Sequence, residues 1–130
     1  KLENIGSFVR RPKTDLIVAV LESGKIGGAV VYFSDMKYYG SGGTATLEKN
    51  ASGFRLLAVD TNSRGLGIGK KLTLECINRA KENGSNQLII HTTISMKVAW
   101  KMYEKLEFQR SEDLDFIQGD LDVFGFRLHL

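Results

Sequence analysis

The chain has 130 residues, of which 42% are hydrophobic and 25% charged, so it is long enough for one hydrophobic core and has the composition of an ordinary globular domain. Its formal net charge of +3 is too small to indicate a nucleic-acid-binding surface, and no apolar run approaches the roughly 20 residues of a membrane-spanning helix. The lone Cys76 excludes an internal disulfide, which favours a reducing, cytoplasmic location and a core-filling role for that side chain. We therefore expect one cytoplasmic domain over residues 1–130.

The first part of the chain predicts a loop followed by a hairpin. Residues 1–14 are basic and weakly patterned, and residues 10–13 predict a loop before Leu16. Residues 15–21 and 26–33 are β-rich runs separated by a short polar turn, which is typical of two antiparallel strands. Residues 38–43 combine glycines with two tyrosines and continue into a polar stretch, which indicates a mobile surface connection up to Ser52.

The second part alternates predicted strands and helices. Strands are expected at 53–59 and 87–92, and amphipathic helices at 67–83 and 96–106, where apolar residues recur at helical spacing. Residues 108–117 and 123–130 read as two closing strands with a turn at 118–120. This order predicts an α+β fold with a mixed, mostly antiparallel central sheet flanked by helices.

The segment between the strand at 53–59 and the following helix reads Arg64-Gly65-Leu66-Gly67-Ile68-Gly69-Lys70. Three glycines on alternate residues leave backbone N–H groups uncovered by side chains. The first turn of the helix adds unpaired N–H donors and the positive end of its dipole. This arrangement binds phosphate groups, so the sequence predicts an anionic cofactor.

Two other phosphate-binding motifs fit this segment poorly. A Walker A loop requires a glycine where Arg64 stands and a serine or threonine where Lys71 stands. A dinucleotide fingerprint requires Gly-x-Gly-x-x-Gly, and here the third glycine comes one residue early. A nucleotide-phosphate-binding protein is therefore a disfavoured alternative.

The pattern Arg-x-x-Gly-x-Gly after Leu57-Ala58-Val59 resembles the acetyl-CoA-binding motif of the GNAT superfamily of N-acetyltransferases. Residues 99–108 resemble a later helix of that family, Ala-x-x-x-Tyr-x-x-x-Gly-Phe, and His91-Thr92-Thr93 resembles a strand of its small bacterial members. The resemblance runs from about Asp15 to the C-terminus. It implies the acyl-CoA N-acyltransferase fold and direct transfer of acetyl from acetyl-CoA to a primary amine.

The resemblance also implies roles for individual residues. Backbone groups of the glycine segment would hold the pyrophosphate, and the strand before it would accompany the pantetheine arm, with the Leu57 N–H facing the acetyl carbonyl. Tyr103 would protonate the leaving thiolate, which is feasible because a phenol has a pKa near 10 against about 8.5 for a thiol. The implied cofactor-binding set is Leu57, Ala58, Val59, Arg64, Gly65, Leu66, Gly67, Ile68, Gly69 and Lys70.

The residue that receives the proton of the amine is less clearly indicated. Where many family members have a glutamate, this chain has Gly53. His91, on the next strand, is the substitute we expect, because histidine titrates near neutral pH; a purely structural histidine is the alternative. Asp60 is a further candidate acting through water, or else it caps the turn.

Other departures from the family pattern define further expectations. Met96 stands where the family often has an asparagine on the pantetheine arm. Glu107 replaces a glycine after the helix, where a left-handed conformation costs about 1 kcal/mol, so a small shift of the helix end is expected. Acidic residues between 112 and 122 either attract a cationic acceptor or are solvated charges.

Further expectations concern the N-terminal portion, a competing function, the oligomeric state and metal binding. Because fewer residues precede the first hairpin than in the family, we expect an N-terminal portion to be missing. A non-catalytic module that binds CoA or acetyl-CoA is the competing function, and a homodimer is left open. No metal site is expected, since His91, His129 and Cys76 lie far apart in the sequence.

Overall fold

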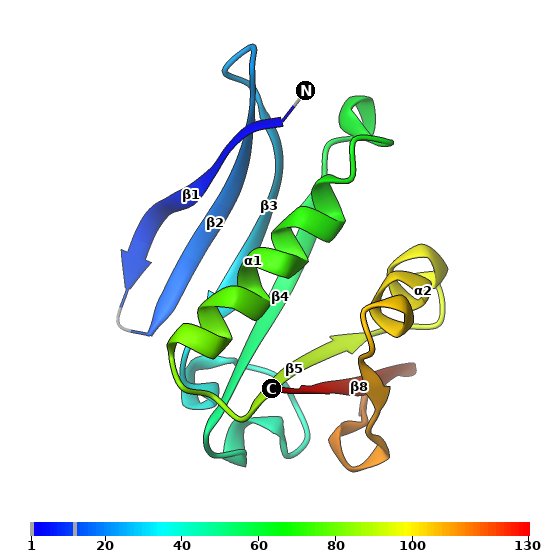
Figure 1. Ribbon diagram of the computed structural model, residues 1–130. Coiled ribbons are helices and arrows are strands. Elements are labelled where there is room, and N and C mark those ends of the chain that lie inside the picture. Colours follow the sequence, from blue (N-terminus) through cyan, green and yellow to red (C-terminus); the bar gives the residue numbers. More distant parts are fainter. Residues whose placement is uncertain (1, 12) are drawn as a thin grey trace.

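The computed structural model describes the backbone of residues 2–11 and the whole of residues 13–130 (Figure 1). The strands are β1 (Leu2–Arg11), β2 (Thr14–Leu21), β3 (Ile26–Phe33), β4 (Ala51–Val59), β5 (Gln87–Thr92), β6 (Gln109–Arg110), β7 (Phe116–Gln118) and β8 (Leu121–His129). They form a sheet of order β1-β2-β3-β4-β5-β8-β6, with β7 paired to β8. Only the β4–β5 pair is parallel among the described strands. This confirms the predicted mixed, mostly antiparallel sheet.

Two α-helices and four short 3-10 helices connect the strands. The α-helices are α1 (Ile68–Glu82) and α2 (Lys97–Lys105), and the 3-10 helices are η1 (Met36–Tyr38), η2 (Ala45–Leu47), η3 (Thr61–Ser63) and η4 (Glu112–Leu114). Figure 1 shows α1 lying across one face of the sheet and α2 beside the far ends of β5 and β8. None of the helices in the described part of the chain has the length and apolar character needed to span a membrane.

The first strand begins well before the hairpin where the sequence predicted it, and the loop expected at 10–13 is wrong at residues 10 and 11, while residue 12 lies outside the described residues. Residues 2–11 form β1, whose pairing with β2 runs from Leu2 opposite Leu21 to Arg11 opposite Thr14. Backbone pairing with a neighbouring strand satisfies the peptide groups whatever the side-chain pattern, so a weakly patterned edge segment still joins the sheet.

Helix α1 packs on the sheet through residues spaced four apart, which places Ile68, Leu72, Cys76 and Ala80 in one buried stripe. The burial of Cys76 confirms the core-filling role expected for it. Close approach depends on Gly28 in β3, because a Cβ there would lie 2.7 Å from Ile68 Cγ2 and 2.9 Å from the Ala58 carbonyl oxygen. The glycine thus fixes where the N-terminus of α1 meets the sheet.

The segment from 38 to 52, expected to be a mobile surface connection, instead contributes to a second core on the opposite face of the sheet. Tyr39 is 0% exposed and packs edge-on against Phe33, with the ring centroids 5.6 Å apart. The other buried members of this cluster are Met36, Ala45, Ala51, Ile89 and Leu114. The expectation was wrong because burial of the tyrosine outweighs the loop-forming tendency of the glycines around it.

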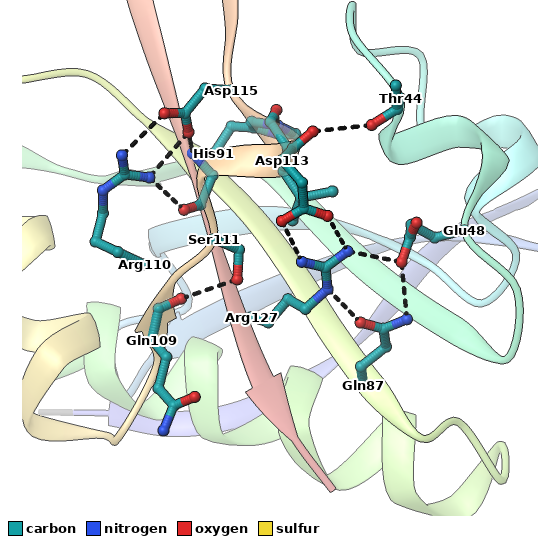
Figure 2. Close-up of polar contacts among 12 residues, drawn as sticks. Thr44, Glu48, Gln87, His91, Gln109, Arg110, Ser111, Asp113, Asp115 and Arg127 are labelled. Carbon is teal, nitrogen blue, oxygen red and sulfur yellow. Dashed lines mark hydrogen bonds and ion pairs between the residues drawn. The ribbon is translucent and has the colours of Figure 1, made fainter.

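The single strand expected at 108–117 is divided into β6, η4 and β7. Two arginines of the sheet hold the intervening segment through paired carboxylates (Figure 2). Arg127 contacts Asp113 at 2.7 Å, and Arg110 contacts both oxygens of Asp115. These contacts offset the loss of regular strand pairing.

Candidate active site

The sheet opens between β4 and β5. The two strands pair only from Ala51 opposite Gln87 to Gly53 opposite Ile89, and beyond that point they diverge (Figure 1). The pairing of β4 with β3 is also irregular there, because Leu56 has a φ of +60° in a bulge between the Arg55 and Ala58 pairs. The β5-facing edge of β4 therefore lies unpaired over residues 54–59.

The glycine segment lies at the N-terminus of α1, next to this opening. Gly65 and Gly67 have φ values of +87° and +72°, and Gly67 is the N-cap of α1. Side chains are disfavoured at such angles, which explains why glycines stand there. The first intrahelical bond at this end runs from the Lys71 N–H to the Gly67 carbonyl, so the N–H groups of residues 68–70 have no partner within the helix.

A groove of about 600 Å³ runs between this segment and α2. It is lined by Leu57, Val59, Arg64, Gly65, Gly67, Ile68, Gly69 and Lys70, with Val98, Ala99 and Met102 of α2 opposite. The structure therefore brings together eight of the ten residues that the resemblance implied for cofactor binding. Ala58 and Leu66 do not line the groove, and both side chains are exposed.

A second cavity of about 320 Å³ continues from this groove into the opening between β4 and β5. Leu57 and Ala99 line both spaces, so they mark the junction. From there the cavity passes Tyr103 and reaches Tyr39, Arg55 and His91, which lie on the face of the sheet away from α1. The two spaces thus adjoin at Leu57 and Ala99, between the glycine segment and the middle of the sheet.

Tyr103 lies on α2 with its ring against Phe54 and Phe108, at centroid distances of 6.0 and 5.5 Å. The side chain is 5% exposed, yet no described residue hydrogen-bonds to its hydroxyl, which borders the cavity. Burial raises the pKa of Tyr103 well above its usual value. The phenol therefore stays protonated at neutral pH and is available to donate a proton or a hydrogen bond into the cavity.

His91 lines the same cavity, and both of its ring nitrogens are engaged. Nε2 lies 2.8 Å from the Leu114 carbonyl, which can only accept, so Nε2 carries the hydrogen and the Tyr39 hydroxyl donates to Nδ1 at 2.9 Å. Burial lowers the pKa of His91, with the Leu114 bond opposing the effect. The imidazole is thus neutral at pH 7 and reaches the cavity through Tyr39.

Tyr39 occupies the space next to Gly53. A Cβ added at Gly53 would lie 2.7 Å from Tyr39 Cε1 and 2.8 Å from Met36 Sδ. Tyr39 and Met36 therefore fill the volume into which a longer side chain at position 53 would project. Sequence reasoning missed Tyr39 because it is distant in the chain from Gly53 and His91. The one signal in the sequence was Gly53 itself, whose lack of a side chain leaves the space that Tyr39 fills.

Two other candidates from the sequence have structural roles. Asp60 accepts a hydrogen bond from Ser63 Oγ at 3.2 Å and lies 3.4 Å from Lys25 Nζ, so it fixes the turn before the glycine segment. Met96 borders the cavity with its sulfur 3.3 Å from Thr92 Oγ1. Met96 stands where the resemblance implied an asparagine that contacts the pantetheine arm, but its thioether sulfur is only a weak hydrogen-bond acceptor.

Of the five acidic residues between 112 and 122, two are paired with arginines. Asp113 and Asp115 are held by Arg127 and Arg110, and neither lines the cavity (Figure 2). Arg127 also contacts Glu48 at 2.7 Å. The pairs fix η4, whose Leu114 carbonyl holds His91, so this network positions the site. No group of metal-ligating side chains was found in residues 13–130.

The chain matches the acetyltransferase (GNAT) family over residues 2–108. It is 31% identical over 102 residues to N-acetylaspartate synthetase of Xenopus tropicalis, covering 78% of this chain and 33% of that protein. It is 33% identical over 76 residues to N-alpha-acetyltransferase 30 of Xenopus laevis, covering 58% and 28%. A Bacillus subtilis acetyltransferase in complex with CoA superposes with a TM-score of 0.71 at 18% identity, covering 100% of this chain and 99% of that one.

The chain therefore belongs to the acetyltransferase (GNAT) family, as its glycine segment and later helix indicated. The structural likeness confirms the fold. The chain spans about a third of the length of the two curated relatives, which are named as a synthetase and an N-acetyltransferase.

Proposed function

We propose that this chain is an acetyl-CoA-dependent N-acetyltransferase in which a primary amine attacks the bound thioester directly. The observation that carries the proposal is that the groove at the glycine segment adjoins the cavity lined by Tyr103 and the Tyr39–His91 pair, with Leu57 and Ala99 common to both. Family membership supports the same reaction class, and the CoA complex of the Bacillus subtilis neighbour supports the cofactor.

The pyrophosphate of acetyl-CoA would lie on the outward-facing N–H groups of residues 67–70, with Arg64 and Lys70 adding charge. The pantetheine arm would follow the unpaired edge of β4 past Leu57, whose N–H would face the acetyl carbonyl as an oxyanion donor. Because the groove joins the cavity at Leu57, the thioester would arrive next to Tyr103.

The amine nitrogen would then form a bond to the thioester carbon, and collapse of the tetrahedral intermediate would break the carbon–sulfur bond. Tyr103 would protonate the departing sulfur and regain its proton from water. The amine proton would pass to the Tyr39 hydroxyl while that hydroxyl gives its own proton to His91 Nδ1. The amine must be neutral to attack, which for a lysine-like amine at pH 7 costs about 4.6 kcal/mol, since 3.4 pKa units are worth 1.36 kcal/mol each. The attack leaves a further proton to be removed from the nitrogen, and this is the proton that His91 accepts through Tyr39.

A cofactor-binding test comes first: thermal unfolding with acetyl-CoA, CoA or ATP. Ligand at a hundred times its Kd adds about 2.7 kcal/mol to stability, so CoA and acetyl-CoA should raise the Tm where ATP does not. Gly67→Glu should lose this gain. Gly84→Glu is the matched control, because Gly84 also has a positive φ and an open surround but lies at the other end of α1. Equal stabilisation by ATP would contradict the proposed cofactor.

Catalysis is tested by release of the CoA thiol with a panel of amines. Tyr103→Phe should lower kcat by about 10²–10⁴ and leave stabilisation by CoA unchanged. Tyr32→Phe is the control, because Tyr32 is buried in the same core but its hydroxyl bonds to Ser52, outside the cavity. The competing function is a non-catalytic CoA-binding module, favoured by the engagement of both His91 nitrogens. CoA binding with no amine-dependent thiol release would establish that alternative.

The location and assembly of the chain stay proposals. We retain the cytoplasm as the proposed location, because Cys76 is buried and unpaired and so gains nothing from an oxidising environment. A single domain over residues 1–130 is consistent with one continuous sheet.

A further inference from the structure

One charged side chain lines the cavity between β4 and β5. Of its lining residues only Arg55 is charged, and no carboxylate is among them. Arg55 Nη1 donates to the Tyr39 carbonyl at 3.0 Å, and its guanidinium lies 5.6 Å from the centre of the Tyr39 ring. Its remaining N–H donors have no partner among residues 13–130, so they are available to a ligand.

Arg55 differs in this respect from every other half-buried arginine in the described part of the chain. Arg79 pairs with Asp15 and Glu75, Arg110 pairs with Asp115, and Arg127 pairs with Glu48 and Asp113. A partly buried guanidinium without a carboxylate keeps only part of its hydration and gains no ion pair in return. An anion bound in the cavity would give Arg55 the ion pair that the other three arginines make with carboxylates of the chain.

Tyr39 connects this guanidinium to the proposed proton acceptor. Arg55 contacts the backbone and ring of Tyr39, and the Tyr39 hydroxyl donates to His91. The anion site and the site where the amine loses its proton are therefore separated by about one tyrosine side chain. A molecule that reaches both must carry its amine and its anion a few bonds apart.

We propose that the acceptor is a small amino acid, whose carboxylate is held by the guanidinium of Arg55 while its amine faces the Tyr39–His91 pair. The inference rests on the proposed acetyltransferase function and specifies its second substrate. A positively charged acceptor such as a polyamine is disfavoured, because Arg55 would repel it with no acidic residue in the cavity to compensate.

The test compares acceptors that differ only in this charge. Glycine, β-alanine, L-alanine and L-aspartate are each assayed beside the matching carboxamide, with the CoA thiol as readout. The amide's amine is less basic and so more fully deprotonated at neutral pH, which means that intrinsic reactivity opposes the preference we expect. For at least one pair, kcat/KM should be about thirtyfold or more higher for the acid, the loss typical of removing one partner of a buried charge pair.

Variants at position 55 should abolish that preference. Arg55→Met should lower kcat/KM for the acid by about thirtyfold or more and leave the amide within about threefold, whereas Arg55→Lys should keep part of the preference. Lys81→Met removes the same charge from an exposed site near the far end of α1 and should change neither value. Unchanged stabilisation by acetyl-CoA checks that each variant folds and that Arg55 does not hold the cofactor.

The outcomes separate this inference from the proposed function. If acids and amides react equally and Arg55→Met changes neither, the enzyme is an acetyltransferase and the inference is wrong. If no amine releases CoA, the proposed function fails, and calorimetric titration of the same acids into the CoA complex decides the inference. Binding that is lost in Arg55→Met supports it, and binding that is absent or independent of Arg55 overturns it.

Discussion

Gly28 links the packing of α1 to the cofactor groove, and Gly28→Ala tests that link. The added Cβ would lie 2.7 Å from Ile68 Cγ2 and 2.9 Å from the Ala58 carbonyl oxygen. The carbonyl oxygen moves only with the backbone, and the Cγ2 methyl moves only if the stiff, β-branched side chain changes its χ1 rotamer. Overpacking of this kind costs about 1–3 kcal/mol, and the entropy gained by replacing glycine offsets about 0.4–1 kcal/mol. We therefore expect a net loss of about 1–2 kcal/mol.

The control is Gly27→Ala. At Gly27 the nearest atoms are Ile68 Cδ1 at 2.8 Å and Leu21 Cδ2 at 3.1 Å, which are the ends of flexible side chains. With about 2.1 cal/mol/K of unfolding entropy per residue, 1 kcal/mol corresponds to about 4 °C in Tm for 130 residues. Thermal unfolding should then show Gly28→Ala lowered by about 4–8 °C and Gly27→Ala by less than about 2 °C.

Cofactor binding supplies a second readout, because Ile68 is the first residue of α1 and moves with its N-terminal donors. The rise in Tm with saturating acetyl-CoA should therefore be smaller in Gly28→Ala than in Gly27→Ala. A Gly28→Ala protein as stable as the wild type, or one less affected than Gly27→Ala, would refute the argument that this glycine sets the height of the helix above the sheet.

Three further changes address strain and protonation. Glu107 has a φ of +73°, so Glu107→Gly should raise the stability measured by urea unfolding by about 1 kcal/mol. The control Glu104→Gly, in the preceding helical turn, should lower the stability by a similar amount. A loss of stability in both variants would show that φ is not the source of the effect. Burial alone would raise the pKa of Asp115, but the bonds from Arg110 and a backbone N–H lower it overall, so the folded state binds fewer protons than the unfolded one. The stability that these bonds contribute is therefore present above the usual pKa of 3.8 and lost as pH falls through the lowered pKa. Urea unfolding between pH 6 and 3 should show a shallower decline in Asp115→Asn than in the wild type, and equal declines would count against the assignment. Because burial holds the pKa of His91 below 6.5, a plot of log kcat/KM against pH for an acceptor of high amine pKa should rise with a slope of 2 below the His91 pKa and 1 above it. His91→Gln should show a slope of 1 throughout. Identical pH profiles for the two proteins would exclude His91 as the proton acceptor.

Local sequence determined much of the framework. The helical spacing of Ile68, Leu72 and Ala80 defined the buried face of α1, and the glycines before it defined a phosphate-binding segment, because both features depend on residues close together in the chain. The conformation after α2 was not predicted, because Glu107 takes up the left-handed conformation that the family glycine would have had instead of avoiding its cost by a shift of the helix end.

Long-range contacts decided the rest. Residues 2–11 became a strand by pairing with β2, and Tyr39 moved from an expected surface loop into a core by packing under β4 and β5. The proposed role of His91 also depends on a residue fifty-two positions away, because Tyr39 donates to its Nδ1.

The sequence by itself determined the family, the fold class and the cofactor segment, because a helix N-terminus with its glycines is built from consecutive residues. The tertiary structure alone decided the proposed acceptor site, where Tyr39, Arg55 and His91 come from separate elements and meet in the opening between β4 and β5. No local pattern encodes that meeting, since it depends on which strands pair, where the pairing ends, and which side chain fills the space beside Gly53.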